Sequence, residues 1–109
     1  MAGHPEDPRA DWVEDVLAIV ESIPPGRVTT YGTIAAALGR YGARQVGNVM
    51  AMHGAGVPWW RVVRADGSLP PSHEGEAGQL YMAEGTPLKR SGAIDMREAF
   101  WEPGEPREL

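Results

Sequence analysis

The sequence contains no cysteine among its 109 residues. This absence excludes disulfide bonds, thiolate metal ligands and cysteine nucleophiles. The three histidines, His4, His53 and His73, lie far apart in the chain. Because their spacing does not match that of metal ligands, we predict no metal site, and no motif indicates a cofactor.

The sequence also has no long apolar run. No segment approaches the roughly 18 apolar residues of a membrane-spanning helix, and the polar start lacks the apolar core of a signal peptide. We therefore expect a cytoplasmic protein. A chain of this length suits one domain. We predict a flexible N-terminus over residues 1–10, a single domain over 11–101 and a loose tail over 102–109.

One segment lacks acidic residues altogether. The net charge is −5, yet no Asp or Glu occurs from Ser22 to Ala65. The same stretch carries the arginines Arg27, Arg40, Arg44, Arg61 and Arg64. Because the local field decides where a polyanion docks, this segment favours a nucleic-acid surface. A cluster of arginines on a solvated face is the plainer alternative.

Two short helices joined by a glycine-containing turn are predicted inside this stretch. Thr30 is a suitable N-cap for a helix over 31–38, and Gly39 stands where a C′ glycine is expected. A second helix is predicted over 43–52, with its apolar residues on one side. This order is typical of a helix-turn-helix, although helical hairpins that bind no DNA look alike.

The remaining segments give weaker signals. A helix over 11–22 follows from its apolar spacing and a cap at Asp11. Val62 and Val63 favour a strand. We expect a last short helix to begin over residues 79–83, and a basic strand or hairpin arm over residues 88–93. We predict a mainly α fold with minor β content, a winged-helix-like helix-turn-helix domain with a small β hairpin or wing.

Three motifs together resemble the DNA-binding domain of the O6-alkylguanine-DNA alkyltransferases. In order, they are Thr30-Tyr31-Gly32-Thr33-Ile34-Ala35, Ala43-Arg44-Gln45-Val46-Gly47 and Pro58-Trp59-Trp60-Arg61-Val62-Val63. In those enzymes the third motif is Pro-Cys-His-Arg-Val, and its cysteine takes the alkyl group. Trp59 stands at the cysteine position here, which resembles the alkyltransferase-like proteins. Those proteins bind alkylated DNA without repairing it and pass the lesion to nucleotide excision repair.

Both changes in the third motif speak against catalysis. Alkyl transfer needs a soft, activated nucleophile, and an indole supplies none. Trp60 replaces the histidine that relays the proton from the cysteine. We therefore expect a protein that is not an enzyme and in which cysteine at position 59 alone would not restore activity.

The resemblance also implies roles for residues before this motif. A protein that inspects the O6 edge must take guanine out of the stack. Arg44 would enter the gap as a finger, with a plain phosphate contact as the alternative. Tyr31 would press on the phosphate beside the target, with a packing role as the alternative. By the same match, four residues would face the minor groove: Ala43, Gln45, Gly47 and Asn48.

The pocket itself would be lined by the third motif and the loop after it. Trp59 would floor the base pocket, unless it is a core tryptophan. Trp60 would contact the lesion or pack. Arg61 would be structural or contact the base. Ser72 falls near positions that contact the base in relatives.

Two function classes compete with a lesion sensor. The alternative is a helix-turn-helix regulator without lesion specificity, but it needs a dimer surface, and no dimerisation helix is evident. A catalytic enzyme with an unusual nucleophile is disfavoured because no Ser-His-Asp set or carboxylate pair recommends it. We expect a monomer whose partner is double-stranded DNA with O6-alkylguanine. Binding should weaken with salt as arginines displace counterions.

Overall fold

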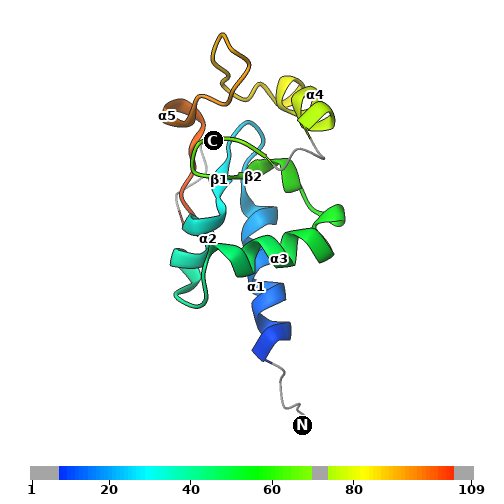
Figure 1. Cartoon of the computed structure of the whole chain (residues 1–109), viewed down its shortest axis with the longest axis vertical. Helices are drawn as coiled ribbons and strands as arrows, with labels where there is room; N and C mark the ends of the chain where they lie inside the picture. Colours follow the sequence, from blue (N-terminus) through cyan, green and yellow to red (C-terminus); the bar gives the residue numbers. More distant parts are fainter. Residues whose placement is uncertain (1–7, 70–73, 105–109) are drawn as a thin grey trace.

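The computed structural model describes residues 8–69 and 74–104 and consists mainly of helices (Figure 1). In chain order the elements are α1 (Pro8–Ser22), β1 (Thr29–Thr30), α2 (Tyr31–Leu38), α3 (Ala43–His53), the 3-10 turns η1 (Gly54–Gly56) and η2 (Trp59–Arg61), β2 (Val62–Val63), α4 (Glu74–Glu84) and α5 (Met96–Ala99). The predicted fold class, a small helical domain with little β structure, is confirmed.

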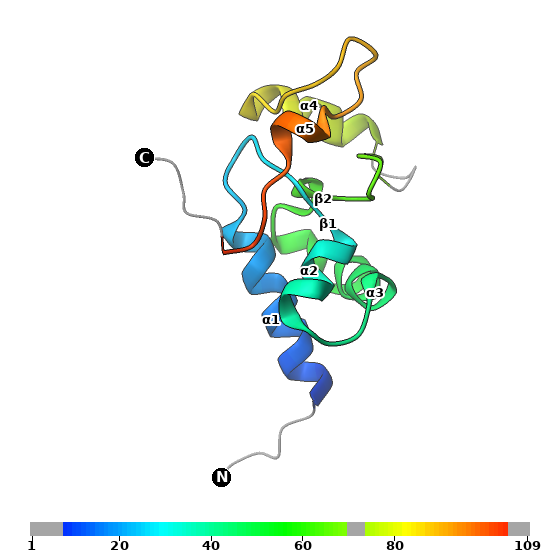
Figure 2. The same ribbon diagram turned by 90° about the vertical axis from the view of Figure 1, so that its left-hand side faces the viewer.

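Helix α1 packs against both helices of the helix-turn-helix, α2 and α3. It begins at Pro8 rather than at Asp11, so the predicted cap was wrong. Proline is well suited to a first helical turn because its missing N–H needs no partner there. The buried side chains of Trp12, Val16 and Val20 repeat every four residues on one face. Helix α3 runs across this helix (Figures 1 and 2).

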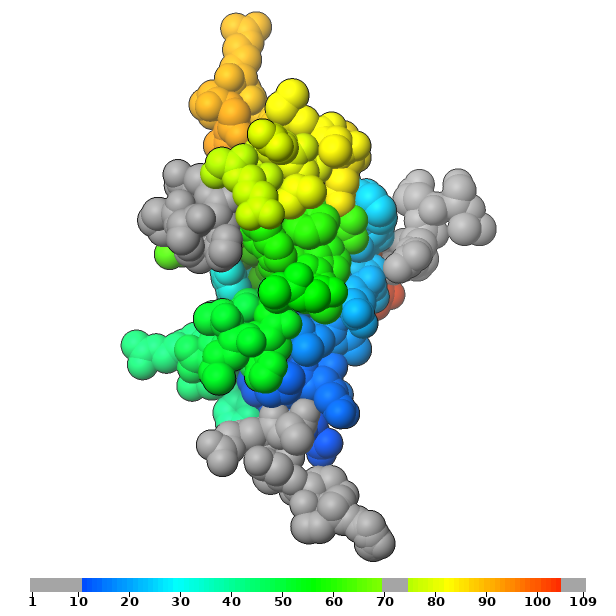
Figure 3. Space-filling view, turned by 90° about the vertical axis from the view of Figure 1, so that its right-hand side faces the viewer, coloured from blue at the N-terminus to red at the C-terminus, as the bar shows by residue number. Residues whose placement is uncertain are grey.

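The two strands form a parallel sheet rather than a hairpin. Thr29 pairs with Val62 and Thr30 with Val63. Parallel strands need a crossover connection, and here α2 and α3 provide it. A separate arm turns between Leu88 and Ile94, which form a single antiparallel bridge. This arm projects beyond α4 (Figure 3) and matches the predicted hairpin arm.

This small sheet separates two hydrophobic clusters. The first contains Trp12, Val16, Val20, Ile23, Ile34, Ala35, Val46, Val49, Val62 and Trp101. The second contains Val28, Val63, Leu69, Ala77, Tyr81, Ile94 and Ala99. Because neighbouring side chains of a strand point to opposite faces, Val62 joins the first cluster and Val63 the second. The strand therefore ties the helix-turn-helix to the part of the fold built from α4 and α5.

Helix α4 begins earlier than predicted. It starts at Glu74 rather than at Gln79. Two glycines inside it, Gly75 and Gly78, lower its intrinsic helix propensity. For this reason its first turn was not predicted from the sequence. Ala77 and Tyr81, one turn apart, are both buried in the second cluster. Tertiary packing on this face outweighs the weak local preference.

Candidate DNA-binding site

The helix-turn-helix is held by local caps on α2. The Thr30 hydroxyl accepts a hydrogen bond of 3.0 Å from the N–H of Thr33. At the other end Gly39 has φ 70°, and its N–H donates to the carbonyl of Ala35 at 2.9 Å. A side chain at such a φ would be strained. The predicted boundaries of this helix are therefore confirmed, and so is the turn into α3.

Helix α3 presents a polar face to solvent. Ala43, Arg44, Gln45 and Asn48 are exposed, whereas Val46 and Val49 are buried against the first cluster. The side chain of Gln45 also closes the start of the helix, where its Oε1 accepts a 3.1 Å hydrogen bond from the N–H of Gly42. The face predicted to meet DNA thus points away from the protein.

Gly47 leaves this face of α3 without a side chain at one position. A Cβ built at Gly47 would meet no atom within 4 Å outside its own helix and its chain neighbours. The residue's φ is not positive, so neither the backbone nor the packing of the free protein requires glycine here. This leaves room for a close approach by another molecule.

Tyr31 and Arg64 lie at the same end of the sheet, where the carboxyl ends of the two parallel strands meet. Each residue directly follows a strand, and the pair Thr30–Val63 is the last in register. Tyr31 is half-buried and Arg64 is exposed. Burial raises the pKa of the Tyr31 phenol, and the Arg64 guanidinium offsets part of that increase. The phenol is therefore uncharged at neutral pH and lies within the field of a cation.

Trp59 and Trp60 sit in the η2 turn that follows α3. The two indole rings meet edge to face, with centroids 5.5 Å apart and an angle of 89° between the planes. Both side chains are half-buried against the second cluster. A Cβ built at Gly54 would lie 3.8 Å from the Cβ of Trp59, so this indole stands directly beside the end of α3. Trp59 is not enclosed in the core.

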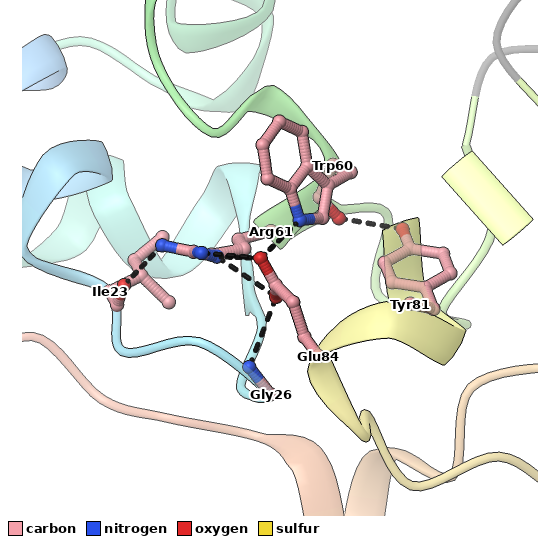
Figure 4. A network of polar contacts seen from close by, with 6 residues as sticks. All are labelled: Ile23, Gly26, Trp60, Arg61, Tyr81 and Glu84. Atoms are coloured by element: carbon pink, nitrogen blue, oxygen red, sulfur yellow. Dashed lines mark hydrogen bonds and ion pairs between the residues drawn. The ribbon is translucent and has the colours of Figure 1, made fainter. Parts of the chain in front are cut away.

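Glu84 on α4 binds the rest of this turn (Figure 4). Its carboxylate accepts hydrogen bonds from the indole Nε1 of Trp60 at 3.0 Å, from Nε of Arg61 at 3.1 Å and from the N–H of Gly26 at 3.1 Å. The Nη2 of Arg61 completes an ion pair with the same carboxylate. Four donor groups from two segments therefore converge on one carboxylate.

The neighbourhood of Glu84 keeps it ionised. Its partial burial would raise the pKa, but the hydrogen bonds from Arg61, Gly26 and Trp60 outweigh this and lower it. Tyr81, one turn earlier on α4, donates from its hydroxyl to the carbonyl of Trp60 at 2.6 Å. Burial raises the pKa of Tyr81 most, followed by its coulombic coupling to the Tyr31 phenol and the Glu84 carboxylate, so its hydroxyl remains a donor. Helix α4 thus fixes both the backbone and the side chain of Trp60.

The five arginines of the acid-free stretch divide into two groups. Arg61 is bound to Glu84 and to the carbonyl of Ile23 at 2.9 Å. Arg27 donates to the carbonyl of Ala99 at 3.1 Å, and Arg40 pairs with Asp15. Within residues 8–69 and 74–104, no hydrogen bond or ion pair is found for the guanidinium of Arg44 or Arg64. Counterion release is therefore expected mainly from these two.

The structure places the predicted site residues on neighbouring elements and adds one residue that the sequence did not indicate. Tyr31, Arg44, Trp59, Trp60 and Arg61 all lie on α2, α3 or the turn that follows. Glu84 was not anticipated, because a single acid 23 positions after Arg61 gives no sequence signal. Its location outside the acid-free stretch was the only hint. The predicted role of Ser72 falls outside the described residues.

Two features are absent from the described part of the chain. No group of three or more His, Asp or Glu side chains suited to a metal ion occurs in the described part of the chain. No helix in that part is long and apolar enough to cross a membrane.

Comparisons with known proteins agree with this geometry. Residues 11–86 match the family model of the 6-O-methylguanine DNA methyltransferase DNA-binding domain. A DNA base-flipping protein of Vibrio parahaemolyticus is 36% identical, with 84% of this chain and 97% of that protein covered. A DNA base-flipping protein of Escherichia coli K12 is 41% identical, with 79% and 70% covered.

The fold is also found among solved structures. S. pombe Atl1 in complex with damaged DNA containing O6-carboxymethylguanine superposes with a TM-score of 0.74 at 28% identity, covering 86% of this chain and 97% of that one. A structure of S. pombe ATL with DNA gives a TM-score of 0.71 at 30% identity, with the same coverage. The resemblance drawn from the three motifs is confirmed. The chain therefore belongs to the family that carries the DNA-binding domain of the 6-O-methylguanine DNA methyltransferases, among its alkyltransferase-like, base-flipping members that lack the reactive cysteine.

Proposed function

We propose that this protein detects O6-alkylguanine in duplex DNA by extruding the nucleotide and holding its base against Trp59, without chemical repair. The observation that carries the proposal is the half-buried indole of Trp59, edge-on to Trp60, where the methyltransferases have their cysteine. A base that reaches this position meets an aromatic surface in place of a nucleophile. It is therefore retained rather than dealkylated.

The energetics of extrusion suit this arrangement. Taking a base out of the stack costs a few kcal/mol, whereas an aromatic contact returns about 1–3 kcal/mol per base. Arg44 supplies the rest, because its planar guanidinium stacks on the neighbouring bases and bonds the orphaned cytosine. Arg44 lies in the first turn of α3, and Trp59 follows the last turn, about 15 Å along the axis. One residue fills the gap while the other receives the displaced base.

We assign Trp60 and Arg61 to the support of Trp59 rather than to contact with the base. Arg61 has a side chain only 13% exposed and is committed to Glu84, which favours the structural one of its two open roles. Trp60 is tethered by its indole nitrogen to the same carboxylate. Its ring packs edge to face with that of Trp59, so we assign Trp60 a positioning role.

The face of α3 supplies the general contact with DNA. Ala43, Gln45, Gly47 and Asn48 approach the minor groove, where small side chains permit a close fit. We extend the proposal to a hand-off of the bound lesion to nucleotide excision repair proteins by a monomer. From the sequence resemblance alone, we propose Ser72 as a further contact of the base.

A salt-controlled titration tests the proposal. Matched fluorescent duplexes with O6-methylguanine or guanine are titrated with the wild type, Arg44→Ala and Trp59→Ala. We expect the wild type to prefer the lesion, and both variants to lose most of that preference. Met82→Ala, at a position 75% exposed on α4, is the control and should behave as the wild type.

Two outcomes would contradict the proposal. Equal affinity of the wild type for both duplexes would remove lesion recognition. Binding that depends on the flanking sequence but ignores the lesion would instead favour a helix-turn-helix regulator.

A further inference from the structure

Arg64 directly follows the third motif and is not part of it. It lies near Tyr31, the residue predicted to contact the phosphate beside the target. We propose that Arg64 and Tyr31 together bind one backbone phosphate, the one adjacent to the extruded nucleotide, with Arg64 as its charged ligand. This inference rests on the proposed function, because it names the phosphate by its position next to the lesion.

The sheet brings these two residues together. Neighbouring parallel strands lie about 4.8 Å apart, and Thr30 and Val63 are register partners. The next residue on each strand, Tyr31 and Arg64, therefore leaves the same edge of the sheet. The influence of Arg64 on the phenol of Tyr31 agrees with this placement.

Both backbones are fixed before DNA arrives. The N–H of Arg64 donates to the carbonyl of Ser68 at 2.9 Å, and its carbonyl accepts from the N–H of Gly67 at 2.8 Å. Gly67 has φ 88°, which a side chain would disfavour. On the other strand, the cap at Thr30 sets the start of α2 and with it the position of Tyr31. A preorganised pair loses little conformational freedom when it binds.

The chemistry suits a phosphodiester. A guanidinium presents parallel N–H donors to two phosphate oxygens. The uncharged phenol of Tyr31 adds an O–H donor. Arg64 is exposed, and in the described part of the chain no acid forms an ion pair with it.

One acid nearby opposes this site. Asp66 is fully exposed, and its carboxylate accepts hydrogen bonds from the N–H and hydroxyl of Ser68 at 3.0 and 2.7 Å. These bonds, together with the weaker influence of Arg64, lower the pKa of Asp66 and keep it charged. It is directed to the turn rather than to Arg64, but its charge repels DNA. Asp66→Asn should therefore strengthen binding at low salt.

Neutralising the protein and the DNA in turn tests the inference. Arg64→Gln should weaken binding to the lesion duplex about 10-fold and reduce the slope of log K against log salt by about 0.9. Arg40→Gln is the matched control, because Asp15 already neutralises that guanidinium. It should leave the slope unchanged. Because Arg64 is exposed, circular dichroism melting should find both variants folded.

Methylphosphonate duplexes locate the contact. Each phosphate flanking the lesion is replaced in turn by a neutral methylphosphonate. At one of these positions the wild type should lose as much affinity as Arg64→Gln does on normal DNA, and the variant should lose nothing further. Tyr31→Phe should be non-additive at the same position.

The outcomes separate this inference from the proposed function. If the wild type prefers the lesion but Arg64→Gln matches it in affinity and slope, the role of Arg64 is refuted alone. The same holds if the Arg64→Gln defect persists undiminished on every methylphosphonate duplex. If the wild type shows no lesion preference, the proposed function fails, and the assignment to a lesion-adjacent phosphate fails with it.

Discussion

Replacing Glu84 by alanine should destabilise the whole fold and not only the η2 turn that carries Trp59 and Trp60. The carboxylate joins α4 to the η2 turn through Trp60 and Arg61, and to the turn after α1 through Gly26. Glu84→Ala removes the single acceptor of all these donors. Among the described residues, the Arg61 guanidinium then keeps one hydrogen-bond acceptor, the carbonyl of Ile23, and its contact with the ring of Trp60.

The size of the effect follows from the burial of the pair. The side chains of Arg61 and Glu84 are each 13% exposed, so water replaces the lost acceptor poorly. Removing one partner of a buried ion pair costs about 3–5 kcal/mol, and the residual exposure places this pair near the lower end. The total free energy of unfolding of native proteins is about 5–15 kcal/mol. We expect a loss of about 3 kcal/mol and a fall in Tm of roughly 10–20 °C.

Urea denaturation followed by circular dichroism measures this directly. Glu76→Ala on the exposed side of the same helix is the matched control. It should change stability by less than about 0.5 kcal/mol. A loss below about 1 kcal/mol for Glu84→Ala would refute the reasoning.

The same interaction predicts a pH dependence, measured on Glu84→Gln. The folded-state pKa of Glu84 is lowered from its ordinary value of 4.5. A depressed carboxyl pKa contributes stability that is present above the unfolded value and is lost as pH falls through the folded one. The stability difference between wild type and Glu84→Gln should therefore be constant near neutral pH and shrink below about pH 4.5. A difference that grows in acid would contradict the lowered pKa.

Three further predictions address single positions. Gly47→Ala should raise stability by up to about 1 kcal/mol in urea melts yet weaken DNA binding in titrations; unchanged binding would mean that α3 does not approach DNA closely. Trp59→Cys should lose lesion preference as Trp59→Ala does, and at concentrations that saturate lesion DNA it should still accept no methyl group, because Trp60 cannot take the thiol proton; a methylated protein in intact-mass spectrometry would contradict this. Gly26→Ala should cost more than about 1 kcal/mol, since φ is 87° and a Cβ would lie 3.1 Å from the carbonyl oxygen of Glu84; a neutral melt would contradict the strain.

Local signals in the sequence predicted the helix-turn-helix well. A Thr30 cap and a C′ glycine are properties of a few adjacent residues, and they gave the bounds of α2 correctly. The same holds for the apolar spacing of α3. Where the boundary depended on distant packing, as at the start of α4, no local signal marked it.

The site shows the same division. Tyr31 and Arg44 lie on the helices predicted for them, because the signals for these helices are local. Trp59 lies in a 3-10 turn that the sequence did not indicate. The partner of Arg61 was not predictable in this way, since it comes from a helix 23 residues later. An arginine counted from the sequence as a DNA contact can thus be a structural residue, and only the fold tells the two apart.

The change at position 60 explains why this site recognises rather than reacts. A histidine can accept a proton at one ring nitrogen while it donates from the other, whereas the indole of Trp60 has one N–H and no acceptor. That N–H is already directed to Glu84, whose lowered pKa keeps it an acceptor for fixed donors. Trp60 can therefore not relay a proton from a nucleophile at position 59 to Glu84. The same hydrogen bond holds the indole of Trp60 beside Trp59, so the arrangement that prevents proton transfer is also the one that, in the proposed function, would steady an aromatic surface for a base.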